Sequence, residues 1–162
     1  MPELQLLHTD HAPAVLAFEL ANRAYFAASV PDRGDDYFAN FAERHQALLA
    51  EQEAGICRFH LLLAEDGEVL GRINLLDLAD GSAELGFRIA EKAAGRGLAT
   101  SAVNQICALA ATDYGLTSLR ARAAVHNAGS RAVLTKAGFT VTGEVVLSGC
   151  PGLRFERALG SV

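Results

Sequence analysis

Two Asp-Gly pairs, at positions 66–67 and 80–81, constrain the fold of this chain more than any other feature. Each pair separates stretches with the alternating apolar pattern of strands, and Asp-Gly between such stretches is a strong signal for a two-residue hairpin turn. The sequence therefore predicts three consecutive antiparallel strands over 56–65, 68–78 and 82–90. This hairpin pattern disfavours a fold built from parallel βαβ units at this point of the chain.

The remaining periodicity predicts helices on both sides of this meander and more strands towards the C-terminus. Helices are expected over 11–28, 37–53, 98–114 and 128–137, where apolar residues keep helical spacing. Further strands are expected over 3–7, 118–125, 139–149 and 153–159, the last two joined by a turn at Pro151-Gly152. With 162 residues, 51% of them hydrophobic, the chain suits one α+β domain over 1–162.

Composition excludes several classes of protein. No run approaches the ~18 apolar residues that span a bilayer, and the N-terminus lacks the regions of a signal peptide. The three cysteines, Cys57, Cys107 and Cys150, fit neither a disulfide framework nor the spacing of a zinc site. A net charge of −5 argues against general nucleic-acid binding. A cytoplasmic protein without a metal, nucleic-acid or membrane partner is therefore expected.

The charges are distributed unevenly along the chain. Residues 1–70 contain 12 acidic and 4 basic side chains, whereas residues 71–162 contain 7 acidic and 10 basic ones. One interpretation is that these are ordinary solvated faces. The other is that the C-terminal half holds an anionic ligand, while an acidic rim with Asp32, Asp35 and Asp36 attracts a cationic one.

A Gly-Arg-Gly sequence at 95–97 stands between a predicted strand and the predicted helix 98–114. Free N–H groups and the helix dipole attract anions to a helix start, and glycine lets the backbone approach them closely. Taken alone, a plain connection explains the sequence equally well. A Walker loop would need Lys-Ser/Thr, which is absent. A dinucleotide-binding loop would need a small residue at the position that Thr100 occupies and an acidic residue at the end of the next strand. This sequence has neither, so such a loop is not expected.

A second motif follows this loop thirty residues later. The segment ELGFRIAEKAAGRGLAT contains the loop, and HNAGSRAVLTKAGF contains an Asn-x-x-Ser, then Lys-x-Gly-Phe. Together they resemble the GNAT superfamily of acetyl-CoA-dependent N-acetyltransferases, whose Gln/Arg-x-x-Gly-x-Gly/Ala loop matches at 94–99, with Ala94 in its first position. The N-terminal segment FELANRAYFAASVP is similar to the RimJ/RimL branch, which acetylates protein N-termini. The resemblance covers nearly the whole chain.

The resemblance implies a fold and an activity. The fold is a mixed, mostly antiparallel sheet of about seven strands flanked by about four helices. The activity is direct attack by a primary amine on acetyl-CoA, the cosubstrate, in a ternary complex. The acceptor that the resemblance favours is a protein N-terminal α-amine. The resemblance also allows a homodimer. A small-molecule amine or antibiotic as acceptor, and a non-catalytic acyl-CoA sensor, stay open as alternatives.

The resemblance also implies a set of site residues. The pantetheine arm is expected along the strand before the loop, and the pyrophosphate at the amides of the loop and helix start. The expected acetyl-CoA residues are Phe87, Arg88, Ile89, Gly95, Arg96, Gly97, Leu98, Ala99, Thr100 and Asn127.

Two side chains are expected to be catalytic, and each has a plain structural alternative. Glu84 is the expected base for the amine proton, or else a cross-strand residue. Ser130 is the expected donor to the sulfur, or else part of a helix start capped by Asn127. His126 either titrates in the site or is structural. The tyrosine that many relatives use as acid has no counterpart after the second motif.

Overall fold

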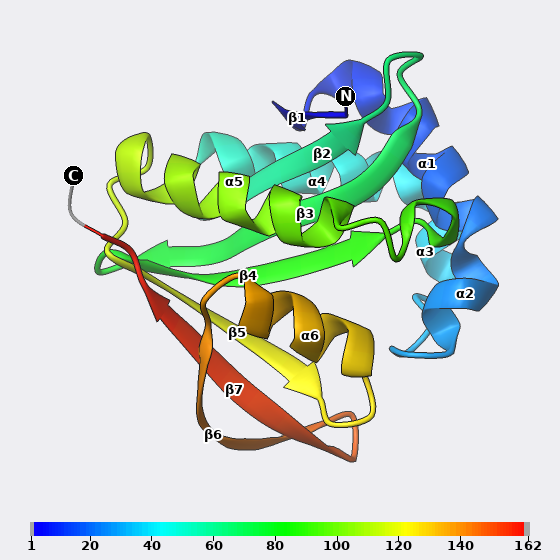
Figure 1. Ribbon diagram of the computed structural model, residues 1–162. Coiled ribbons are helices and arrows are strands. Elements are labelled where there is room, and N and C mark those ends of the chain that lie inside the picture. Colours follow the sequence, from blue (N-terminus) through cyan, green and yellow to red (C-terminus); the bar gives the residue numbers. More distant parts are fainter. Residues whose placement is uncertain (1, 161–162) are drawn as a thin grey trace.

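The computed structural model describes residues 2–160 and places seven strands in one sheet with helices on both faces (Figure 1). The strands are β1 (Glu3–Leu6), β2 (Arg58–Leu63), β3 (Val69–Ala79), β4 (Ser82–Ile89), β5 (Ser118–Ala124), β6 (Thr140–Leu147) and β7 (Cys150–Ala158). The α-helices are α1 (Ala12–Ala21), α2 (Arg23–Ala27), α3 (Asp35–Ala39), α4 (Phe41–Glu53), α5 (Leu98–Thr112) and α6 (Ala128–Lys136). Two short 3-10 helices, η1 (Thr9–His11) and η2 (Glu91–Ala93), complete the list.

The sheet has the order β1-β2-β3-β4-β5-β7-β6, and the β4–β5 pair is parallel while the other pairs are antiparallel. The predicted meander is confirmed as β2, β3 and β4. Its first turn is closed by the Gly67 N–H, which donates to the Ala64 carbonyl at 2.9 Å. Its second turn, at Asp80-Gly81, brings Ala79 opposite Ser82. The expected mixed, mostly antiparallel sheet is therefore confirmed.

The two N-terminal helices predicted over 11–28 and 37–53 are each divided, which raises the expected four helices to six α-helices in residues 2–160. The divisions fall at Asn22 and Asn40. Each side-chain amide donates to the carbonyl four residues earlier, at 2.9 Å to Phe18 and 3.0 Å to Asp36. Asparagine side chains compete in this way with the helical backbone pattern, so each helix ends and restarts there.

The closing hairpin forms as predicted, but its predicted turn is wrong. The chain reverses at Ser148-Gly149, both in the left-handed region, and Leu147 faces Cys150 across the turn. Pro151 and Gly152 lie inside β7, opposite Val146 and Val145. Proline is tolerated in a strand where its missing N–H is not needed, so Pro-Gly alone did not locate the reversal.

Two hydrophobic clusters cover the two faces of the sheet, as alternation along the strands requires. Leu62 of β2 belongs to the cluster under α5 and α6, together with Ile73, Leu75 and Leu134. Its neighbour Leu61 belongs to the cluster formed with α1 to α4. In Figure 1, α5 crosses in front of the sheet and α4 lies behind it.

The parallel pair at the centre of the sheet is short. Ser82 to Leu85 of β4 pair with Ser118 to Ala121 of β5, but β4 continues to Ile89 and β5 to Ala124 without pairing to each other. Figure 1 shows the two arrows diverging from this point. The divergence leaves part of β4 with a free edge inside the molecule. No helix within residues 2–160 is long and apolar enough to cross a membrane.

Candidate active site

Two clefts open where β4 and β5 diverge, and they share part of their walls. Their volumes are about 410 Å³ and about 380 Å³. Five residues line both: Ser29, Val30, Phe87, Asn127 and Ser130. Because the same side chains line both clefts, a molecule held in one cleft can meet a molecule held in the other at this junction.

The first cleft is bounded by the Gly-Arg-Gly loop and the start of α5. Gly95 and Gly97 have φ of +75° and +74°, in the left-handed region that favours glycine, and a Cβ at either position would meet no atom within 4 Å. Gly97 is the N-cap residue of α5 and has no side chain that could cap the helix by a hydrogen bond. The first amides of this helix therefore stay available, and with the helix dipole they form a site for an anion such as a phosphate.

Most of the expected acetyl-CoA residues lie in the wall of the first cleft. The structure brings these together there: Phe87, Arg88, Ile89, Gly95, Gly97, Ala99, Thr100 and Asn127. Two do not line it. The Arg96 side chain is exposed on the outside of the loop, and Leu98 packs against the hydrophobic cluster under α5. Only the backbone of these two residues, in the loop and at the start of α5, is placed to take part in such a site.

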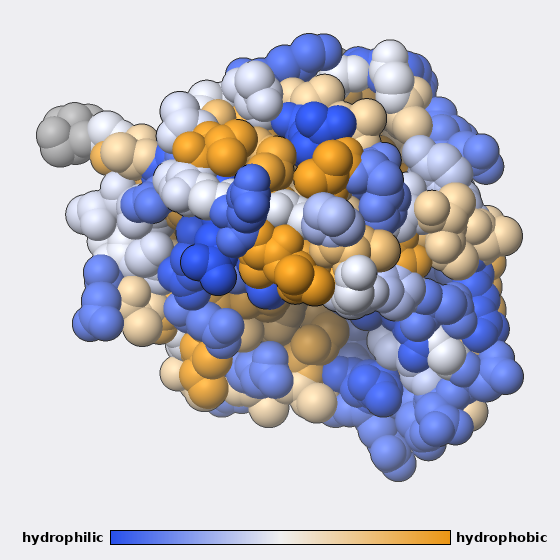
Figure 2. Space-filling view, turned by 90° about the horizontal axis from the view of Figure 1, so that it is seen from below, coloured by the Kyte–Doolittle hydropathy of each residue, from blue (hydrophilic) through white to orange (hydrophobic). Residues whose placement is uncertain are grey.

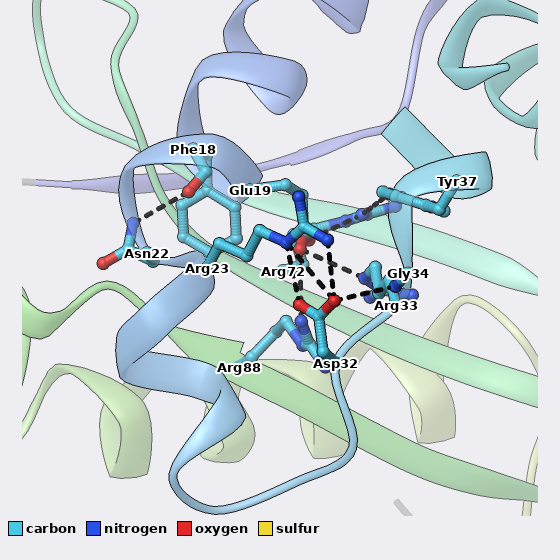
Figure 3. A network of polar contacts seen from close by, with 10 residues as sticks. All are labelled: Phe18, Glu19, Asn22, Arg23, Asp32, Arg33, Gly34, Tyr37, Arg72 and Arg88. Carbon is cyan, nitrogen blue, oxygen red and sulfur yellow. Dashed lines mark hydrogen bonds and ion pairs between the residues drawn. The ribbon is translucent and has the colours of Figure 1, made fainter. Parts of the chain in front are cut away.

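The side chain of Arg88 belongs to a buried ionic network that was not predicted from the sequence (Figure 3). At its centre is Glu19 of α1, whose side chain is 1% exposed. Arg72 of β3 donates to one carboxylate oxygen at 2.9 Å, and Arg33 and Arg88 donate to the other at 3.1 Å each. Burial raises the pKa of Glu19, but the attraction of the three guanidinium groups outweighs it and lowers this pKa overall.

This network fixes one wall of the clefts. Arg88 also lies over the Phe26 ring, 4.6 Å from its centroid, and Arg72 donates to the Tyr37 hydroxyl at 3.2 Å. The loop after α2, which carries Ser29 and Val30, thus lies between two residues that contact the network, Phe26 and Arg33. The signal in the sequence was a glutamate in the middle of an otherwise apolar helix, which needs a partner when it is buried.

The expected acidic rim is mostly internally paired. The carboxylates of Asp32 and Asp35 each lie 2.8 Å from an Arg23 guanidinium nitrogen. Hydrogen bonds from Arg23 lower the pKa of Asp32 to about 2. Two of the three rim carboxylates therefore share a counter-charge already, and the rim is a poorer attractor of cations than its sequence suggests.

The second cleft is lined mainly by small and apolar residues. Apart from the five shared residues it includes Leu85, Gly86, Ala121, Ala123 and Leu147. Among residues 2–160, its wall contains no aspartate or glutamate, and its titratable side chains are Arg122, His126 and Cys150. The face seen from below has a recess that is bordered by both hydrophobic and hydrophilic residues (Figure 2). This cleft suits an uncharged, compact group rather than a polycation.

The two expected catalytic residues have different surroundings. Ser130 lies at the junction of the clefts, and its N–H donates to the Asn127 side-chain oxygen at 3.3 Å. The capping interpretation of Asn127 is thus confirmed, and its amide nitrogen is left as a donor in the cleft wall. Glu84 lines neither cleft; its carboxylate is bonded by Arg122 across the β4–β5 pair at 2.9 Å.

A tyrosine from an N-terminal helix lies in the wall of the first cleft. Tyr25 of α2 lines this cleft beside Phe26. Its phenol comes from a different part of the chain than the tyrosine that many relatives carry after the Asn-x-x-Ser motif. No group of three or more His, Cys, Asp or Glu side chains in the part of the chain that the structure describes could hold a metal ion.

Comparison with known proteins gives one consistent answer. A family model described as an acetyltransferase (GNAT) domain matches residues 3–140. YdaF of Bacillus subtilis (strain 168), named as a ribosomal N-acetyltransferase, is 33% identical over 124 residues, which cover 74% of this chain and 64% of that relative.

The solved structures agree on the fold. The ribosomal-protein-S5-alanine acetyltransferase from Vibrio fischeri superposes with a TM-score of 0.89 at 16% identity, over 98% of this chain and 93% of that one. RimJ of Mycobacterium smegmatis, solved in complex with CoA-disulfide, gives a TM-score of 0.85 at 24% identity, over 96% of this chain and 80% of that one.

Proposed function

This chain belongs to the GNAT acetyltransferase family, and on that basis we propose that it transfers the acetyl group of acetyl-CoA to the N-terminal α-amine of a peptide or protein. Membership of an N-acetyltransferase family sets aside a non-catalytic sensor. The likeness to YdaF, which is named as a ribosomal N-acetyltransferase, supports the acceptor class.

The observation that carries the proposal is the meeting of two chemically different clefts. The first ends at a glycine loop and a helix start without a side-chain cap, which suit the diphosphate of acetyl-CoA. The second is small, mostly apolar and, in the described residues, without a carboxylate. A polyamine or an aminoglycoside would bring several ammonium groups to a wall with no counter-charge, whereas a peptide N-terminus brings one amine and neutral backbone.

In this proposal the pantetheine arm follows the free edge of β4 at Phe87 to Ile89, where backbone groups no longer pair with β5. The diphosphate accepts hydrogen bonds from the amides of Gly95 to Thr100. The amide of Asn127 donates towards the arm. The thioester thereby reaches the junction, where the amine from the second cleft attacks its carbonyl carbon.

As the C–N bond forms, the C–S bond breaks and its electron pair leaves on sulfur. Ser130 is the proposed proton donor to the departing thiolate, because its hydroxyl lies in the wall shared by both clefts. The helix start of α6, where Ser130 lies, favours developing negative charge nearby. Glu84, bonded to Arg122 outside both walls, is not assigned the role of base.

The proposal is tested by offering the protein acetyl-CoA and a panel of amines and measuring thiol release, with mass spectrometry of the acceptor. The panel contains peptides beginning with Ala, Ser or Met, spermidine, and an aminoglycoside. The matched control is the same peptide with a blocked N-terminus and one internal lysine. We expect acetylation of the free N-termini alone; preferred turnover of spermidine, the aminoglycoside or the lysine would contradict the proposed acceptor.

A further inference from the structure

We propose that His126 is the catalytic base that takes the proton from the attacking amine, an inference that rests on the proposed transfer to an N-terminal amine. The transfer needs a group that accepts a proton near neutral pH beside the incoming nitrogen. His126 stands in the turn between β5 and α6, directly before Asn127, and it lines the second cleft.

The lining of the second cleft leaves few other proton acceptors. Its titratable side chains in residues 2–160 are Arg122 from β5, Cys150 from β7 and His126 itself. Arginine stays charged at all ordinary pH values and a thiol is a poor base in its neutral form. The segments 27–31 and 85–87, and the start of α6, contribute no titratable side chain to this wall. Glu84 is held by Arg122 outside it.

The position of the imidazole suits a base. Its Nε2 lies 3.3 Å from the Ser29 carbonyl oxygen, which can only accept a hydrogen bond. The neutral ring therefore donates from Nε2 and keeps the lone pair on Nδ1 as a proton acceptor. When Nδ1 takes a proton, the bond from Nε2 to Ser29 is retained and strengthened, because the ring is then a cation.

The same contact ties the base to the junction. Ser29 lines both clefts and belongs to the loop between α2 and Arg33, and Arg33 donates to Glu19. On the other side, the N–H of Asn127 donates to the Ala124 carbonyl at 2.9 Å and fixes the turn that carries His126. The ring is thus held by the Ser29 carbonyl, and the turn that carries it is held by a backbone bond. The side chain is exposed to solvent and can return its proton there.

The proton balance is complete without a further reactant. The amine nitrogen forms the C–N bond and passes one proton to Nδ1 of His126. The C–S bond breaks, the leaving thiolate takes one proton from Ser130, and solvent returns a proton to the Ser130 oxygen. His126 then releases its proton to solvent. An N-terminal α-amine has an ordinary pKa of about 7.7–8.0, so near neutral pH a useful fraction is neutral and can attack; lysine amines near 10.4 are mostly charged.

The test compares His126→Gln and His126→Ala with wild type, with His8→Gln as the matched control. His8 is an exposed histidine that lines neither cleft. Glutamine can still donate to the Ser29 carbonyl but cannot act as the base. With acetyl-CoA and a peptide beginning with Ala, we expect kcat to fall about 10²-fold in both His126 variants, with acetyl-CoA affinity unchanged.

Two readouts separate a base from a structural contact. The pH dependence of kcat in wild type should change in His126→Gln, and added imidazole should restore turnover to His126→Ala. A kcat close to wild type, or a fall with an unaltered pH profile and no imidazole rescue, would overturn the proposal. If the wild-type protein acetylates only a small amine, the proposed acceptor is wrong, and the same variants assayed with that amine test His126 as the base. If the wild-type protein acetylates no amine, the proposed function and the proposed base are both wrong.

Discussion

Replacing Gly97 by valine tests the phosphate-binding role of the loop before α5. Gly97 is the residue before the first turn of this helix, has φ of +74° and lines the first cleft. A Cβ there meets no protein atom within 4 Å, so the new side chain occupies the open space that the diphosphate needs. It also strains the left-handed backbone and so displaces the amides at the helix start.

The expected loss of affinity follows from the bonds removed. A hydrogen bond to a charged group contributes about 1.5–3 kcal/mol, so losing one or two of them weakens acetyl-CoA binding by about 2–4 kcal/mol. At 1.4 kcal/mol for each factor of ten, Kd rises roughly 30- to 1,000-fold. The backbone strain costs about 1–2 kcal/mol of folding free energy, which lowers Tm by roughly 2–8 °C for a chain of this length.

Gly115→Val is the matched control, because Gly115 has φ of +65°, an unobstructed Cβ position and no place in either cleft wall. Both variants should lose similar stability in thermal unfolding. Calorimetric titration with acetyl-CoA should show weaker binding for Gly97→Val alone. Equal Kd values for the two variants would refute the phosphate-binding role of the loop. The backbone strain that both variants share would then explain the result without steric exclusion of the diphosphate.

Three further outcomes are expected. Ser130→Ala should lower kcat about 10²-fold with little change in acetyl-CoA affinity, while Tyr25→Phe, which removes a phenol that lines the first cleft, should not; the reverse result would move the acid to α2. Burial lowers the pKa of His60 to about 4 from the ordinary 6.5. As the pH drops, His60 therefore takes up a proton in the unfolded chain before it does so in the folded one, and the free energy of unfolding falls between about pH 6.5 and 4 by up to about 3 kcal/mol. Urea unfolding of wild type and His60→Phe checks this, because the variant should lose that part of the slope. Glu19→Gln leaves Arg72 buried without its counter-charge and should destabilise by about 3–5 kcal/mol in the same assay; a change below about 1 kcal/mol would contradict the network's role.

The parts of the fold that the sequence predicted are those specified by local patterns. Asp-Gly between alternating strands, and apolar residues at helical spacing over 98–114, are decided within a few residues of chain. The errors came where two local signals competed. Asn22 and Asn40 sit in helical patterns, but their side chains bond the preceding turn and divide the helices. Pro151-Gly152 looked like a turn because no local feature shows that β7 extends past it.

The site divides in the same way. The glycine loop was predictable, because its chemistry lies in consecutive backbone amides at a helix start. The roles of Glu84 and Arg88 were not, because each depends on a partner far away in sequence: Arg122 lies 38 residues from Glu84, and Glu19 lies 69 residues from Arg88. Ion pairs of this separation leave no periodic pattern, so only the folded chain reveals which carboxylates are already committed to arginines.

The Glu19 network also explains how a short helix and a loop can form a cleft wall. A buried ion pair is a weak source of stability, since apolar residues of the same volume often stabilise a core as well. It does fix direction, however, because a carboxylate that receives three guanidinium groups admits few arrangements of the chains that carry them. Here those chains are α1, β3, β4 and the loop with Arg33. Ser29 and Val30 follow α2 in the loop that leads to Arg33, and the Ser29 carbonyl contacts the ring of His126. The network thus supports the loop whose Ser29 bonds the proposed base, and one of its arginines, Arg88, itself lines the first cleft.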